Sequence, residues 1–211
     1  MKNIFLITTY LLTLTSLAQS DPSKYGVAGQ GDELPMGLKV GQQAPDFTLN
    51  SSRGIAVNIQ KELEKGPVVL IFYRGIWCPV CSRYLSNIQD SLRYILDAGA
   101  SLLAVTGEVQ EYTAKMSEDV GAEFPILSDK DEAVMKDYDV LFDVTDWYVT
   151  KVKVGQLSSI QKNTGQEDDR LPVPATYVID KQGVIRYVQF DYNYKNRASV
   201  KDIIRAIKGL I

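Results

Sequence analysis

The 211-residue chain contains no histidine and only two cysteines, Cys78 and Cys81. Without histidine there is no imidazole base to activate the nucleophile of a cysteine protease. A zinc site needs about four cysteine, histidine or carboxylate ligands, and two cysteines without any histidine fall short of that set. No nucleotide or flavin motif is present, so we expect no metal and no other cofactor. Any chemistry of the two cysteines must therefore rest on sulfur.

Runs of basic residues are also missing. The chain has 23 lysines and arginines against 26 acidic residues, which gives a net charge of −3. Nucleic-acid-binding domains carry clustered positive charge, so we expect no nucleic-acid partner. The remaining composition is ordinary for one globular domain, and it leaves the oligomeric state open.

The longest apolar stretch near the N-terminus, residues 4–17, is too short for a typical membrane span. Lys2 precedes it and Ser16-Leu17-Ala18 follows the small-x-small pattern of a cleavage site. We therefore expect a signal peptide at residues 1–18 and a protein exported to the periplasm or secreted, with an uncleaved anchor as the less favoured alternative. Residues 19–39 are rich in Gly, Asp, Ser and Pro, which predicts a linker before a domain at residues 40–211.

Apolar runs alternate with helical patterns across this domain. Strands are expected at residues 44–49, 54–59, 68–73, 101–106, 124–127, 175–180 and 184–190, and helices at residues 78–95, 109–120, 131–138 and after residue 199. Residues 139–170 lack periodicity and predict irregular structure. The order predicts an α/β fold with a mixed central sheet and helices on both faces.

The segment Trp77-Cys78-Pro79-Val80-Cys81 directly follows the apolar run at residues 68–73. Two thiols at this spacing, where a strand ends and a helix begins, indicate a redox pair. A helix N-terminus lowers the pKa of a cysteine from ~8.5 to roughly 3.5–7.5. We expect Cys78 to be the nucleophile, and Cys81, one turn deeper, to be the resolving thiol.

Three neighbouring residues are expected to support this pair. Pro79 suits the first helical turn, where its missing N–H costs no hydrogen bond. Trp77 is expected to cover the two thiols. Arg74 either adds positive potential at the site or is a solvated loop residue, and the sequence leaves both open.

Three segments, at residues 40–47, 72–81 and 171–180, resemble the thioredoxin superfamily, and more closely the peroxiredoxin-like branch of the alkyl hydroperoxide reductase/thiol-specific antioxidant (AhpC/TSA) family. The resemblance implies a thioredoxin-like fold and a redox-active disulfide with an antioxidant role. It also implies that Pro174 is a cis-proline beside the cysteines, with Val173 next to it.

The chain departs from the peroxiredoxin pattern at the residues that polarise peroxide. The family motif Pro-x-x-x-Thr-x-x-Cys places its proline at Ile71 and its threonine at Gly75, and Pro174 stands where the family has an arginine. The sequence leaves four possible substitutes for that arginine: Arg74, Arg170, Arg186 and Arg197.

A thioredoxin feature is absent as well. Thioredoxins carry a buried carboxylate in the strand before the active site, and residues 68–73 contain no acid. Glu62, Glu64 or Glu108 are the candidates to accept the proton of Cys81, and the sequence does not choose among them.

Three functions remain open. The leading hypothesis is a thiol–disulfide oxidoreductase, in which Cys78 attacks a protein disulfide beside Val173 and Pro174 and Cys81 resolves the mixed disulfide. The alternative is a peroxiredoxin-type thiol peroxidase that reduces hydrogen or alkyl peroxides, with Cys78 peroxidatic and Cys81 resolving. A thioredoxin-like or membrane electron donor would recycle the enzyme. The third is a non-catalytic module with a structural disulfide, although so short a loop stabilises little.

Overall fold

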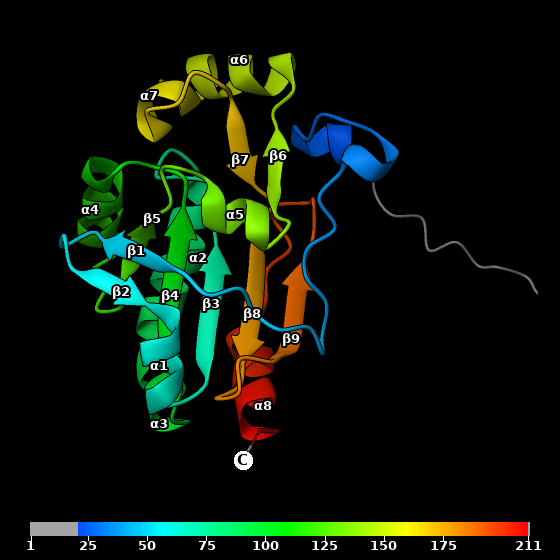
Figure 1. The fold of residues 1–211 in the computed structure, drawn as a ribbon. Helices are drawn as coiled ribbons and strands as arrows, with labels where there is room; N and C mark the ends of the chain where they lie inside the picture. The colour runs from blue at the N-terminus through cyan, green and yellow to red at the C-terminus, as the bar shows by residue number, and fades with distance from the viewer. Residues whose placement is uncertain (1–20, 211) are drawn as a thin grey trace, which may run out of the picture.

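A computed structural model describes residues 21–210, and the expected signal peptide at residues 1–18 lies outside this range. A seven-stranded sheet in the order β2-β1-β5-β4-β3-β8-β9 forms the centre (Figure 1). Strand β3 pairs in parallel with β4 and antiparallel with β8, so the sheet is mixed as predicted. The strands are β1 (Thr48–Ser51), β2 (Ala56–Asn58), β3 (Val68–Phe72), β4 (Ser101–Thr106), β5 (Ile126–Ser128), β6 (Leu141–Asp143), β7 (Arg170–Pro172), β8 (Ala175–Ile179) and β9 (Ile185–Phe190).

Helices cover both faces of this sheet, which confirms the predicted architecture (Figure 1). They are α1 (Ile59–Lys65), α2 (Pro79–Asp90), α3 (Leu92–Asp97), α4 (Gln110–Asp119), α5 (Ala133–Asp137), α6 (Asp146–Gly155), α7 (Ile160–Thr164) and α8 (Val200–Lys208). No helix within residues 21–210 is long and apolar enough to cross a membrane.

Strand β3 is buried on both faces because its side chains alternate between two hydrophobic clusters. Val69 and Ile71 pack with the residues of α2, α3 and α8 on one face. Val68, Leu70 and Phe72 pack with the residues of α1 and α5 on the other. All five β3 residues are fully buried, as their continuous apolar run predicts. The loop after β3 therefore starts from a rigid central strand.

The helix predicted at residues 78–95 is divided in two. α2 ends at Asp90 and α3 begins at Leu92, with Ser91 between them in a non-helical conformation (φ −107°, ψ 2°). The predicted apolar face nevertheless holds across the break, because Leu85, Ile88, Leu92 and Ile95 are all buried.

Residues 139–170 are not irregular, contrary to the prediction. They contain β6, α6, α7 and the start of β7, and β6 pairs antiparallel with β7 as a second, two-stranded sheet. Figure 1 places α6 and α7 beyond the end of the main sheet, in yellow and olive at the top. The strands span only three residues each and α7 five, which is too short for a period to show in the sequence.

The described part of the predicted linker also packs on the domain. Val27 is buried and pairs with Val144, which follows β6. The hydroxyl of Tyr192 donates a hydrogen bond of 2.7 Å to the carbonyl of Pro35. Residues 21–39 are thus part of the folded body, because their few apolar side chains find partners on the 139–170 segment and beside β9.

Candidate redox site

The two cysteines lie where β3 gives way to α2. Cys78 is the N-cap residue of α2, with extended backbone angles, and Pro79 occupies the first turn as predicted. The Sγ of Cys78 accepts a hydrogen bond of 3.3 Å from the backbone N–H of Cys81. This sulfur therefore takes the place of the oxygen that usually caps a helix, and it faces the positive end of the helix dipole.

Both thiols are free and buried, with Cys78 only 1% exposed and Cys81 fully enclosed. Their Sγ atoms lie 2.6 Å apart. Two arginines flank the pair: Arg74 Nη2 lies 3.6 Å from the Sγ of Cys78, and Arg197 Nη2 lies 3.3 Å from the Sγ of Cys81. Each sulfur thus has its own guanidinium donor, and the pair is placed to form a disulfide without moving α2.

Arg74 is a buried residue of the site and not a solvated loop residue. Its side chain is 2% exposed, and its guanidinium carbon lies 3.6 Å from the ring centroid of Tyr194 and 5.1 Å from that of Tyr148. The ring centroid of Trp77 lies 5.5 Å from the same guanidinium carbon, and Trp77 is itself only 8% exposed. These three rings form an aromatic cage around the cation, and they shield the cysteines from solvent.

The electrostatics of the pair follow from this arrangement. Burial opposes ionisation of Cys81, but the hydrogen bond with Cys78 and the charges of Arg197 and Arg74 hold its pKa well below the usual value. The hydrogen bond with Cys81, together with burial, raises the pKa of Cys78. Since the two Sγ atoms are in contact, the thiols titrate as a coupled pair, and ionisation of one opposes ionisation of the other.

A buried carboxylate, Glu108, supports the loop that leads to Cys78. Its Oε2 accepts a hydrogen bond of 2.9 Å from the backbone N–H of Ile76, and its Oε1 accepts one of 2.9 Å from Asn163 Nδ2. Burial raises the pKa of Glu108 to about 8. A side chain on Gly75 (φ +157°) would collide with Glu108 and Trp77, so the loop requires glycine there.

The other two acids considered from the sequence lie elsewhere. Glu62 bonds to Lys65 and Ser101, beside the start of β3, and Glu64 is exposed on the same helix. Among the three candidates, only Glu108 lies at the end of the sheet that carries the cysteines.

The prediction that Pro174 follows a cis peptide bond is wrong. Pro174 is buried, but residues 21–210 contain no cis peptide bond. The chain runs extended from β7 to β8, and the N–H of Val173 donates a hydrogen bond of 2.7 Å to the carbonyl of Val140. A trans bond satisfies this geometry. The backbone N–H of Val173 is thus already used inside the protein.

Sequence reasoning missed the side chains that enclose the site. Tyr148 lies in α6, inside the segment predicted to be irregular, and Tyr194 follows β9. The sequence held one signal for a helix in the 139–170 segment, namely Ser159, whose side chain caps α7. Of the four arginines considered, Arg170 pairs with Glu132 and Arg186 with Asp180, so Arg74 and Arg197 are the two at the thiols. Across residues 21–210, no group of His, Cys, Asp and Glu side chains could hold a metal ion.

Comparison with known proteins agrees with this geometry. Residues 40–188 match the model of the AhpC/TSA family. The chain is 25% identical over 170 residues to peroxiredoxin Q of Oryza sativa subsp. japonica, covering 81% of this chain and 67% of that protein. It is 27% identical over 152 residues to the thiol-disulfide oxidoreductase ResA of Geobacillus kaustophilus, covering 72% and 69%.

The fold is also shared with solved structures. Peroxidoxin BcpB from Mycobacterium tuberculosis superimposes with a TM-score of 0.64 at 20% identity, covering 82% of this chain and 99% of that one. The family match spans the thiol pair, its loop and the strands that carry them. The chain belongs to the AhpC/TSA family and is a thiol-based oxidoreductase of thioredoxin-like fold.

Proposed function

We propose that the protein is a thiol peroxidase that reduces hydrogen peroxide or small organic hydroperoxides. Cys78 passes its proton to Cys81 across the contact between their sulfurs, and the Cys78 thiolate attacks one peroxide oxygen. The O–O bond breaks, and the alcohol or water leaves after taking up one proton. Cys78 is then a sulfenic acid. The Cys81 thiol attacks this sulfur, water leaves, and a Cys78–Cys81 disulfide forms.

The observation that carries this proposal is the burial of Cys78 beneath its aromatic cage. A peroxide of few heavy atoms needs only a narrow opening, whereas a protein disulfide needs an exposed sulfur and a free backbone edge. The N–H of Val173, at the position expected beside a substrate backbone, is bonded to Val140. Both facts favour a small substrate.

Two arginines supply the electrostatics that the missing threonine and arginine would otherwise give. Negative charge develops on the leaving oxygen as the O–O bond breaks, and donors fixed in a buried site stabilise such charge strongly. Arg74 and Arg197 are fixed within 3.6 Å of the two sulfurs. The likeness to peroxiredoxin Q supports the same substrate class.

A second candidate is thiol–disulfide exchange, favoured by the C-x-x-C pair at a helix N-terminus and by the likeness to ResA. It requires the aromatic cage, Trp77 included, to move away before a partner sulfur can reach Cys78.

For recycling, we propose a thioredoxin-like dithiol as the electron donor, with a membrane donor as the alternative. We further propose that the protein is exported, on the basis of the signal pattern at residues 1–18. Fractionation of cells that express the full chain checks this, because a processed product outside the cytoplasm is expected.

The deciding experiment compares two reactions of the reduced protein: consumption of hydrogen peroxide and reduction of a protein disulfide such as insulin. A peroxide rate far above that of free cysteine, with disulfide formation at Cys78 and Cys81, is expected. Cys78→Ser should abolish it. Cys81→Ser should retain one turnover and leave Cys78 as a sulfenic acid that reacts with dimedone. A peroxide rate equal to that of free cysteine, with rapid insulin reduction, would establish the second candidate instead.

A further inference from the structure

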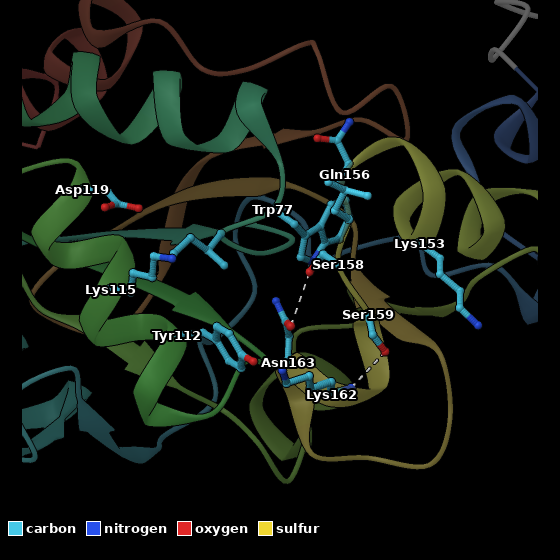
Figure 2. Close-up of a pocket in the computed structure, with 12 residues that line it drawn as sticks. Trp77, Tyr112, Lys115, Asp119, Lys153, Gln156, Ser158, Ser159, Lys162 and Asn163 are labelled. Carbon is cyan, nitrogen blue, oxygen red and sulfur yellow. Dashed lines mark hydrogen bonds between the residues drawn. The ribbon is translucent and has the colours of Figure 1, made fainter.

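An open pocket of about 680 Å³ lies beside the redox loop, between α4, α6 and α7. Figure 2 shows its lining side chains, which come from segments far apart in the sequence. Ile76 and Trp77, the two residues before Cys78, form part of its wall. Its volume is within the range of small-molecule sites. A ligand in this pocket would therefore touch the loop that carries the nucleophile.

The charged groups around the pocket are mostly of one sign. Lys115, Lys153 and Lys162 line it, and Asp119 is the single acid that does so. Within residues 21–210, none of these lysines has a carboxylate oxygen within the 4.0 Å of an ion pair. The whole chain carries a net charge of −3, so a local excess of two positive charges sets this surface apart. Lys153 extends away from the hollow in Figure 2, so the ammonium groups of Lys115 and Lys162 are the ones placed to attract an anion there.

The rest of the lining is apolar or neutral. Ile76, Trp77, Tyr112 and Leu157 give aromatic and aliphatic surface, and Leu157 is 91% exposed with a left-handed backbone (φ +50°). An apolar side chain in that position gains nothing from solvent and is available to cover an apolar ligand. The pocket thus offers cations together with an apolar wall, which matches an organic anion better than an inorganic one.

Hydrogen bonds connect the pocket to the redox site. Asn163, which lines the pocket, donates to the buried carboxylate of Glu108, and Glu108 accepts from the N–H of Ile76. The indole Nε1 of Trp77 is buried without a partner among the described residues. The wall between pocket and thiol is therefore a single loop, held from the pocket side by Asn163 and Glu108.

We propose that this pocket binds organic anions, and that the preferred peroxide substrate is a hydroperoxide that carries a carboxylate. The lysines hold the carboxylate, the apolar wall holds the hydrocarbon body, and the peroxide end points past Trp77 toward Cys78. That the ligand is a hydroperoxide rests on the proposed peroxidase function. That the pocket binds organic anions does not.

Binding is tested first, with unreactive ligands. The chain has two tryptophans, Trp77 and Trp147, so Trp147→Phe leaves Trp77 as the only indole reporter. In this background, 4-phenylbutyrate should give a saturable change in Trp77 fluorescence. The neutral 4-phenylbutanol should bind about tenfold or more weakly, and added salt should weaken only the acid.

The matched variants are two double substitutions with the same change in charge. Lys115→Met with Lys162→Met should weaken binding of 4-phenylbutyrate about tenfold or more. Lys201→Met with Lys208→Met, two exposed lysines of α8 away from the pocket, should leave it unchanged. The inference is overturned if the acid binds no better than the alcohol, or if the control pair loses as much affinity as the pocket pair.

Turnover is tested second, with a carboxylate-bearing hydroperoxide and its methyl ester. The free acid should show a KM about tenfold lower than the ester. The pocket variants should remove this difference, whereas Lys201→Met with Lys208→Met should keep it. Anion binding without rapid consumption of hydrogen peroxide would refute the peroxidase and keep the pocket. Rapid consumption without anion preference would refute the pocket alone.

Discussion

The guanidinium of Arg74 donates a hydrogen bond of 3.6 Å to the sulfur of Cys78, which lies four residues further along the chain. The tight loop from Gly75 to Trp77 brings the two together, and the aromatic cage prevents water from screening their interaction. A charge pair in such a site interacts more strongly than one at the surface.

Arg74→Met should therefore raise the pKa of the thiol pair, while the methionine side chain still fills the space inside the cage. Each unit by which the pKa rises reduces the thiolate fraction about tenfold at a pH below it, so peroxide consumption at neutral pH should fall about tenfold or more. Titration of the thiolate ultraviolet absorbance measures the shift directly. Arg93→Met, at an exposed side chain, is the control. An unchanged titration in Arg74→Met would show that the cation does not stabilise the thiolate.

Arg197→Met should act on the second step. Its Nη2 contacts Cys81 at 3.3 Å, so its loss leaves the resolving thiol less acidic and slows disulfide formation. The sulfenic acid of Cys78 should then live about tenfold longer, which labelling with dimedone at short times would detect. Slower sulfenic acid formation with unchanged resolution would contradict this assignment.

Glu108 should make stability depend on pH. Burial raises its pKa to about 8, above the ordinary value of 4.5. Between these values the folded protein holds a proton that the unfolded chain has released, so stability falls as pH rises through this window and levels off above about 8. Glu108→Gln should flatten the decline, which amounts to about a few kcal/mol.

Urea unfolding of both proteins across this pH window provides the measurement. Other groups titrate in both proteins, so the difference between the two curves isolates Glu108. Parallel curves would mean that Glu108 ionises normally in the folded state.

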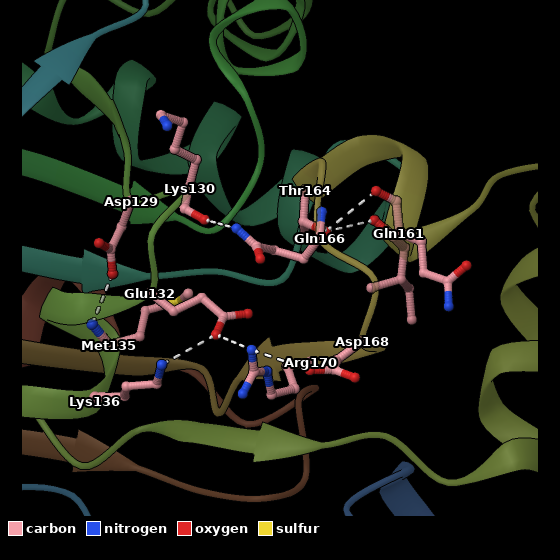
Figure 3. Close-up of polar contacts among 11 residues, drawn as sticks. Asp129, Lys130, Glu132, Met135, Lys136, Gln161, Thr164, Gln166, Asp168 and Arg170 are labelled. Carbon is pink, nitrogen blue, oxygen red and sulfur yellow. Dashed lines mark hydrogen bonds and ion pairs between the residues drawn. The ribbon is translucent and has the colours of Figure 1, made fainter.

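A second buried carboxylate, Glu132, joins α5 to the segment that covers the site. Figure 3 shows it between Arg170 and Lys136. Its Oε2 lies 2.7 Å from Arg170 Nη2 and 3.5 Å from Lys136 Nζ. Glu132→Gln leaves Arg170 without its closest anion, and we expect a loss of about 1–3 kcal/mol in unfolding free energy, since Arg170 is partly exposed. Asp168→Asn, at a side chain that is 69% exposed, should change it by less than about 0.5 kcal/mol. Equal losses in the two variants would refute a special role for Glu132.

The sequence was sufficient to predict the central sheet and the thiol pair because their signals are local. The apolar run of β3 and the C-x-x-C after it each lie within a few residues, and the helix that begins at Cys78 follows from the positions of Leu85 and Ile88. Arg74 could be suspected on proximity alone, but its burial depends on Tyr148 and Tyr194.

The cage itself could not be predicted, because its rings come from three distant segments, at Trp77, Tyr148 and Tyr194. Tyr148 lies in a helix whose apolar pattern is weak, and the contacts of residues 21–39 depend on β6 and β9, which no local pattern connects to them. Pro174 illustrates the opposite error. The resemblance implied a cis bond, while the pairing of the neighbouring β6 and β7 strands extends the chain there and keeps the bond trans.

Among the described residues, Arg74 has no Asp or Glu oxygen within the 4.0 Å of an ion pair, so the thiolate is its nearest anion. Oxidation to the disulfide removes that anion and leaves a buried cation without a counterion. The dithiol form is therefore favoured, which raises the reduction potential of the couple in the same sense as in other proteins whose reduced form is stabilised. Such a disulfide forms only with a strong oxidant and is readily reduced by ordinary dithiols, which makes each catalytic cycle easy to complete.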